Sequence, residues 1–232
     1  MSVAANEAGA VPARPSRLAL FWDSSIGKKA LMALSGLILS LYVVAHLVGN
    51  LQIFSGPTAI NEYAEWLHSK PAMIWFARIV LLAAVGVHAI AGIQLYMRRN
   101  EARPVAYHTR KNIQGSAPSQ TMIWTGVLIL FFVVYHLLDL TTGTVNPDFQ
   151  ALKPYHNVVV SFGRPLAAIF YIISMVGLGF HLWHGVYSMF HSLGLSHPRY
   201  TPGVRKGAAA VATILAMGMA SIPLFVLLGV VE

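Results

Sequence analysis

Five long apolar runs, separated by polar and turn-rich stretches, dominate the sequence. They cover residues 29–54, 71–97, 120–140, 164–190 and 204–231. Each run reaches the roughly 20 residues that a membrane-spanning α-helix needs. The pattern therefore predicts an all-α membrane protein with five transmembrane helices, and the 56% hydrophobic and 10% charged composition agrees with it.

Basic residues flank the five runs unequally. If the N-terminus is inside the cell, the cytoplasmic side holds 12 of them: Arg14, Arg17, Lys28, Lys29, Arg98, Arg99, Arg103, Arg110, Lys111, Arg199, Arg205 and Lys206. The other side holds four, which are Lys70, Arg78, Lys153 and Arg164. The positive-inside rule then places the N-terminus in the cytoplasm. Because topology accounts for most of the net charge of +8, we expect a lipid bilayer and no nucleic acid as a partner.

The chain opens with a segment rich in Ala, Gly and Pro that has no apolar core of its own. We expect residues 1–20 to form a disordered tail and residues 21–232 to form one transmembrane domain. The chain has no cysteine, which excludes iron–sulfur ligation, covalent c-type haem attachment and disulfides within it. Any redox centre must therefore be held by other side chains.

One candidate ligand histidine lies in each of the first four apolar runs. On helices that rise about 1.5 Å per residue, His46 and His136 lie about 24 to 26 Å from the inner surface. His88 and His181, on helices of opposite direction, lie about 26 Å from the outer surface. The four histidines therefore form two level pairs, one in each half of the membrane, separated by roughly 10 to 15 Å.

Two imidazoles that approach from opposite sides are the axial ligands of a b-type haem, and the core of a four-helix bundle suits this cofactor. We therefore expect four of the five helices to form a bundle that binds two haems. A single histidine in a membrane is more commonly a hydrogen-bonded core residue or part of a proton relay. The matched depths of four histidines favour the haem interpretation.

Small and charged residues occur at the depths of these pairs. Gly36 and Gly126 each stand ten residues before an outer histidine, at the depth of the inner pair, where glycine lets a porphyrin approach the backbone. Arg78 stands ten residues before His88, at the depth of the outer pair, and a haem propionate is a natural partner for it. The alternative is an arginine that extends to the outer interface.

Five segments occur in a fixed order along the chain: SSIGKKALMALSG, HLVGNLQIFSGP, NEYAEWLHS, GVHAIAGIQL and GFHLWHGVYSMFHSLG. In this combination the chain resembles the cytochrome b membrane anchor of succinate dehydrogenase or fumarate reductase, in its single-subunit, five-helix, di-haem form. The resemblance covers nearly the whole chain after Phe21. It implies that His46 and His136 hold the haem distal to the soluble subunits, and that His88 and His181 hold the proximal haem.

The resemblance also distinguishes between His181 and His184, the two histidines of the fourth run. The family's ligand stands four residues before a glycine, here Gly185, which selects His181 rather than His184. His184 is then expected to contact a haem propionate or a neighbouring helix. Arg164 is a further candidate to bind a haem propionate or to support a ligand.

The resemblance implies a membrane anchor and electron-transfer subunit of a succinate:quinone oxidoreductase, multi-pass in a bacterial cytoplasmic membrane. A flavoprotein subunit with covalent FAD and an iron–sulfur subunit are expected on the cytoplasmic face, and menaquinone is the quinone expected for this class. The chain itself has no dicarboxylate site and no catalytic residue. The direction of the reaction and the oligomeric state of the complex stay open.

A quinone of this class reacts near the distal haem. The candidate residues in that region are Glu62, Glu65 and Asp139. A solvated surface explains the two glutamates equally well.

Two other functions fit parts of the pattern. One is the cytochrome b subunit of another quinone-linked enzyme, such as a hydrogenase or formate dehydrogenase; that of quinol–cytochrome c reductase places two ligands on each of two helices, unlike this chain. The other is a transporter that uses histidines as a proton relay or as metal ligands. A transporter predicts no visible absorption, and the sequence has no pair of short Gly/Pro-broken repeats to support it.

Overall fold

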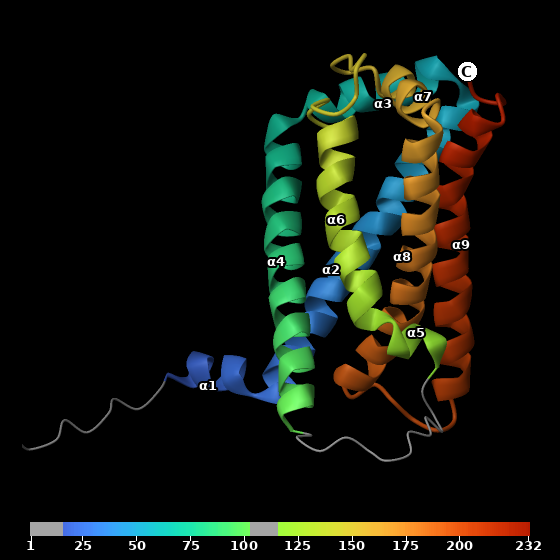
Figure 1. Ribbon diagram of the computed structural model, residues 1–232. Coiled ribbons are helices and arrows are strands. Elements are labelled where there is room, and N and C mark those ends of the chain that lie inside the picture. Colours follow the sequence, from blue (N-terminus) through green and yellow to red (C-terminus); the bar gives the residue numbers. More distant parts are fainter. Residues whose placement is uncertain (1–15, 103–115) are drawn as a thin grey trace, which may run out of the picture.

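The computed structural model describes residues 16–102 and 116–232, and the regular elements in these ranges are helices (Figure 1). The long helices are α2 (Ser25–Asn50), α4 (Pro71–Glu101), α6 (Met122–Leu140), α8 (Pro165–Ser192) and α9 (Thr201–Leu227). All five are long and apolar enough to cross a membrane, and a short 3₁₀ helix, η1 (Leu51–Ser55), extends the first of them. The predicted all-α membrane fold is confirmed.

The long helices alternate in direction along the chain. Figure 1 places the first residues of α2, α6 and α9 and the last residues of α4 and α8 at one end of the bundle, which we call the inner end. The basic residues at this end include Lys28, Lys29, Arg98 and Arg205, as the charge pattern predicts for a cytoplasmic face. Arg14, Arg103, Arg110 and Lys111 lie outside the described residues.

Short helices lie at both ends of the bundle. At the inner end are α1 (Arg17–Asp23) and α5 (Ala117–Gln120), and at the outer end are α3 (Pro57–His68) and α7 (Pro154–Phe162). The structure corrects part of the expected disordered tail, because residues 17–20 belong to α1; residues 1–15 lie outside the described residues. The Ser16 hydroxyl accepts a 3.2 Å hydrogen bond from the Ala19 amide, which caps this helix.

Four of the long helices form a closed ring. Neighbours around the ring are α2 and α4, α4 and α6, α6 and α8, and α8 and α2. Helix α9 lies outside the ring, against α8 and α2. The diagonal partners across the centre are therefore α2 with α6 and α4 with α8.

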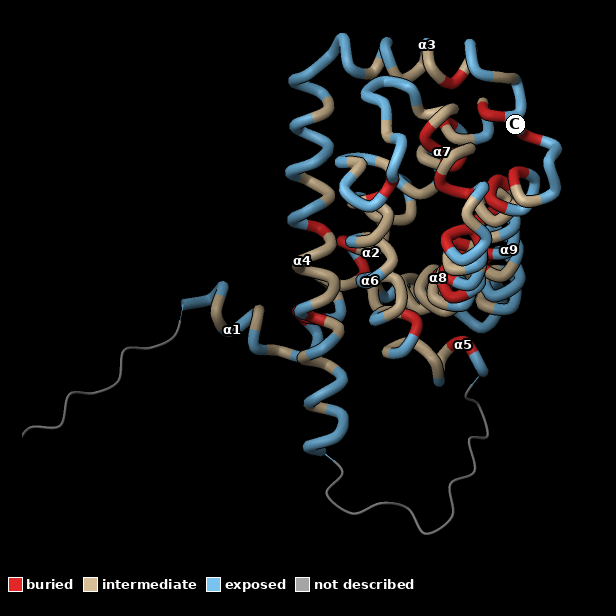
Figure 2. Tube along the Cα trace, turned by 45° about the horizontal axis from the view of Figure 1, so that its top comes forward, coloured by how far each residue is buried: buried red, intermediate tan, exposed pale blue. Residues whose placement is uncertain are grey.

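Apolar side chains cover the outside of the bundle. Leu82 on α4 is 76% exposed and Met217 on α9 is 68% exposed, as expected for side chains that face lipid. Figure 2 shows α4 largely exposed, whereas α8 carries many of the buried positions. Small buried residues on α8, such as Ala168 and Ser174, let its neighbours approach closely.

Candidate functional site

The four predicted histidines meet in two pairs inside the ring. The ring centroids of His46 and His136 are 5.7 Å apart, and those of His88 and His181 are 6.1 Å apart. Each pair joins two diagonal helices, and the pairing is the one expected from depth. A metal bound through imidazole nitrogens at about 2 Å on each side would hold the two ring centres roughly 6 Å apart. Both spacings therefore suit an iron between the rings.

Among the described residues, each pair consists of its two histidines alone. In residues 16–102 and 116–232, no group of three or more His, Asp or Glu side chains is placed to hold a metal ion. Two axial imidazoles are the complement that a haem iron takes from a protein, since the porphyrin supplies the other ligands. The donor set thus fits a haem at each pair.

Hydrogen bonds at the inner pair leave one ring nitrogen of each histidine free for a metal. His88 Nδ1 lies 3.1 Å from the Met32 carbonyl oxygen, which can only accept, so Nδ1 carries the proton. His181 Nδ1 lies 3.2 Å from the Thr125 hydroxyl, which donates its own proton to the Thr121 carbonyl. Both histidines therefore present an unprotonated Nε2, the form in which imidazole binds metals.

Tyrosine hydroxyls take the corresponding places at the outer pair. Tyr42 stacks on His46 with ring centroids 5.3 Å apart, and its hydroxyl lies 3.5 Å from His46 Nδ1. On the other side, the Tyr171 hydroxyl lies 3.4 Å from His136 Nδ1. All four histidines thus have a polar neighbour at Nδ1, an arrangement typical of histidines that bind a metal through Nε2.

An internal repeat links the two pairs and could have been read from the sequence. The residues Met32, Ser35, Gly36 and His46 recur 90 positions later as Met122, Thr125, Gly126 and His136. The residues Gly86, His88 and Gly92 recur 93 positions later as Gly179, His181 and Gly185. The repeat aligns His88 with His181, whereas His184 aligns with Ala91. It therefore supports His181 independently of any family pattern.

Two glycines of this repeat lie against the inner pair. A Cβ atom at Gly36 would lie 3.2 Å from His88 Cε1, and one at Gly126 would lie 3.5 Å from His181 Cε1. Each glycine therefore leaves room beside the imidazole of the neighbouring helix, at the depth predicted for it.

The Gly126→Val protein is expected to bind severalfold less haem at the inner pair, because the branched side chain would press on the His181 ring. The haem content per chain of the purified protein measures the effect. Gly207→Val is the matched control, since a Cβ at Gly207 on α9 meets nothing within 4 Å. An unchanged haem content in the Gly126 variant would show that this contact does not matter.

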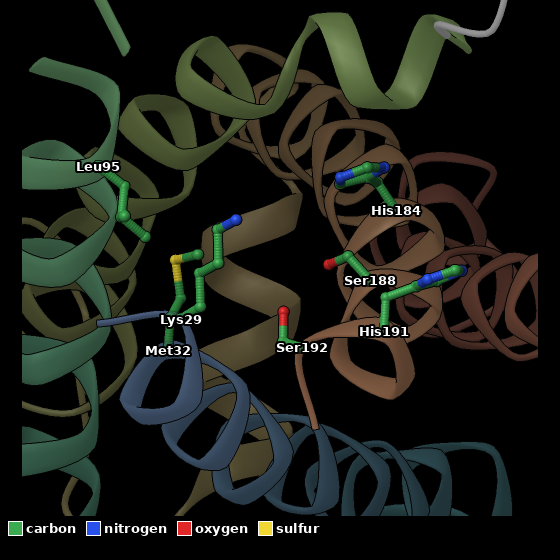
Figure 3. A pocket seen from close by; sticks show the side chains of 7 residues that line it. All are labelled: Lys29, Met32, Leu95, His184, Ser188, His191 and Ser192. Carbon is green, nitrogen blue, oxygen red and sulfur yellow. The ribbon is translucent and has the colours of Figure 1, made fainter. Parts of the chain in front are cut away.

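A cavity of about 400 Å³ opens at the inner end, close to the inner pair (Figure 3). Its lining residues come from α2, α4 and α8, and are Lys29, Met32, Leu95, His184, Ser188, His191 and Ser192. The Lys29 ammonium and the serine hydroxyls are donors that suit a carboxylate. His184, expected to contact a propionate, therefore lies in suitable surroundings, while His191 Nε2 is 2.7 Å from the Tyr187 hydroxyl.

Arg164 and Asp139 form an ion pair with each other. Arg164 Nη2 lies 2.7 Å from Asp139 Oδ1, and its Nη1 donates to the Val145 carbonyl at 2.8 Å. Asp139 is fully buried and also accepts a hydrogen bond from the Ser161 hydroxyl. The two residues therefore bind each other, and their roles at a propionate and at a quinone stay predictions.

The remaining candidates lie nearer the surface. Glu62 and Glu65 are exposed on α3 at the outer end. The Arg78 guanidinium lies 5.2 Å from the centre of the Trp75 ring. Arg78 is exposed, so both the propionate and the interface interpretation fit its place.

The fold is that of a polytopic membrane protein whose four-helix ring encloses two histidine pairs. The sequence model described as succinate dehydrogenase/fumarate reductase transmembrane subunit matches residues 99–220, which is more than half of the chain. The chain therefore belongs to this family and is a membrane-anchor subunit of succinate dehydrogenase or fumarate reductase. No curated protein and no solved structure matched the chain.

Proposed function

We propose that this subunit binds two b-type haems, which when bound supply one-electron carriers between an iron–sulfur subunit and a quinone. The observation that carries the proposal is the arrangement of the histidines: two pairs on diagonal helices, with ring centroids 5.7 and 6.1 Å apart. Polar partners at Nδ1 hold each ring and leave Nε2 for iron. His46 and His136 hold the outer haem, and His88 and His181 hold the inner one.

Other residues of the chain serve these two sites. Lys29 and His184, which line the cavity at the inner end, neutralise and bind the propionates of the inner haem. Arg78 does so at the outer haem. Gly36 and Gly126 keep the inner pair accessible.

The partners follow the orientation of the bundle. The iron–sulfur and flavoprotein subunits dock at the inner end, where the basic residues gather, in a bacterial cytoplasmic membrane. Menaquinone reacts near the outer pair, and the exposed carboxylates of Glu62 and Glu65 on α3 exchange its protons with water. Membership of the succinate dehydrogenase/fumarate reductase family favours this function over the cytochrome b of a hydrogenase or formate dehydrogenase.

Redox-titrated visible spectroscopy of the purified complex tests the proposal. Two b-type components with separate midpoint potentials are expected, with two haems extracted per copy of this chain. A colourless complex, or a single haem per chain at full purity, would contradict it.

A further inference from the structure

A buried network of hydrogen-bonded polar side chains lies next to His136. Asp139 and Ser161 are fully buried and Tyr171 is 5% exposed, in the outer half of a membrane-spanning bundle. The Tyr171 hydroxyl lies 3.0 Å from Asp139 Oδ2 and 3.4 Å from His136 Nδ1, and therefore connects the carboxylate to the imidazole. Polar groups at such depth are costly unless they are paired, and here they are paired with one another.

The direction of these hydrogen bonds follows from the number of protons available. Tyr171 has one hydroxyl proton and donates it to the Asp139 carboxylate. Its oxygen can then only accept from His136, so the proton lies on Nδ1 and the lone pair on Nε2. Arg164 Nη2 lies 2.7 Å from the other carboxylate oxygen, and this ion pair fixes the Asp139 side chain in place.

The first half of the internal repeat lacks this network of polar side chains. The position that matches Asp139 is Gly49, and the position that matches Tyr171 is Arg78. The histidines of the inner pair also differ, since their Nδ1 atoms face the Met32 carbonyl and the Thr125 hydroxyl, which are neutral. In the described part of the protein, His136 is the one of these four histidines whose hydrogen-bond partner itself donates to a carboxylate.

We propose that Tyr171 is a positioning residue of the outer haem, which links the Asp139 carboxylate to His136 and thereby lowers the reduction potential of that haem. A carboxylate that polarises the Nδ1–H bond makes Nε2 a stronger electron donor, and a stronger donor stabilises the ferric iron relative to the ferrous iron. This inference rests on the proposed haem at the outer pair. It goes further by assigning the two haems unequal potentials from the unequal surroundings of their ligands.

The Tyr171→Phe variant tests the proposal in the complete membrane complex. Both haems stay bound, the midpoint potential of one rises, and that of the other is unchanged; the largest g-value of the same haem in the electron paramagnetic resonance spectrum shifts with it. Tyr135→Phe is the matched control. It removes the phenol hydroxyl of the residue that precedes His136 in the sequence, whose ring lies against Phe170 and Tyr171, and it leaves both potentials unchanged.

The Asp139→Asn variant and the double variant separate a path through Tyr171 from a direct effect of charge. Asp139→Asn alone raises the midpoint potential of the outer haem. In the Tyr171→Phe background it adds little, because both substitutions break the same hydrogen-bonded network. Full additivity of the two shifts, or unchanged potentials in Tyr171→Phe with both haems bound, overturns the proposal. If the Tyr171→Phe complex lacks the outer haem, the midpoint potential of the outer haem in the Asp139→Asn complex tests the proposal. A raised potential supports it, and an unchanged potential overturns it. A wild-type complex without haem would instead contradict the proposed function itself.

Discussion

The His136→Ala subunit is expected to retain one haem and to lose the other. His136 and His46 face each other across the bundle with ring centroids 5.7 Å apart, so one imidazole alone would remain at the outer site. Substitution of a residue that hydrogen-bonds to a metal ligand typically lowers metal affinity about 10- to 100-fold. Loss of the ligand itself should lower it at least as much. We expect one haem per chain in the visible spectrum and a fall in quinone-linked succinate oxidation of at least about 100-fold.

The His46→Ala subunit should show the same spectrum, because in the proposed outer site both histidines hold the same iron. Succinate oxidation with a water-soluble dye is the control, since that reaction takes place in the soluble subunits and should continue. Two variants that lose different haems, or a His136→Ala protein with both haems, would contradict the outer pair.

Substitution of the two neighbouring histidines of α8 should have opposite outcomes. His181→Ala is expected to abolish the inner haem, since His181 faces His88 at 6.1 Å and its Nδ1 is held by the Thr125 hydroxyl. His184→Ala should keep both haems, because His184 lines the cavity at the inner end and aligns with Ala91 in the internal repeat. The measurement is haem per chain together with the redox-titrated spectrum.

The pair of variants is its own control, because both remove an imidazole from the same helix within one turn. A His184→Ala protein that lacks the inner haem, beside a His181→Ala protein that retains it, would reassign the ligand. Loss of the haem in both variants would indicate that His184 is needed to hold a propionate.

The sequence was sufficient to predict the five spans and the levels of the histidines. A helix in a membrane must satisfy its own backbone hydrogen bonds, so apolar runs are read directly as spans, and the fixed rise per residue converts position into depth. Depth alone brought His46 level with His136 and His88 level with His181, and the structure places these rings together. Gly36 and Gly126 were found in the same way.

Contacts that depend on the rotation of a helix about its axis could not be predicted from depth. The ion pair of Arg164 with Asp139 joins the start of α8 to the end of α6, and its formation depends on how the helices are rotated about their axes. The ion pair between Arg164 and Asp139 was therefore not predicted. Helix α7 was also missed, because its nine residues follow a turn-rich loop and are too few to show a clear period.

Each histidine pair takes one member from each half of the internal repeat, and this has a consequence for biogenesis. The helices α2 and α4 form one half and α6 and α8 form the other, so neither half contains a complete site. In the proposed holoprotein, binding of the two haems therefore links the two halves after both have entered the membrane. By mass action, a ligand present at 1,000 times its dissociation constant contributes about 4 kcal/mol to the assembled state, so cellular haem supply would control how much of this anchor matures.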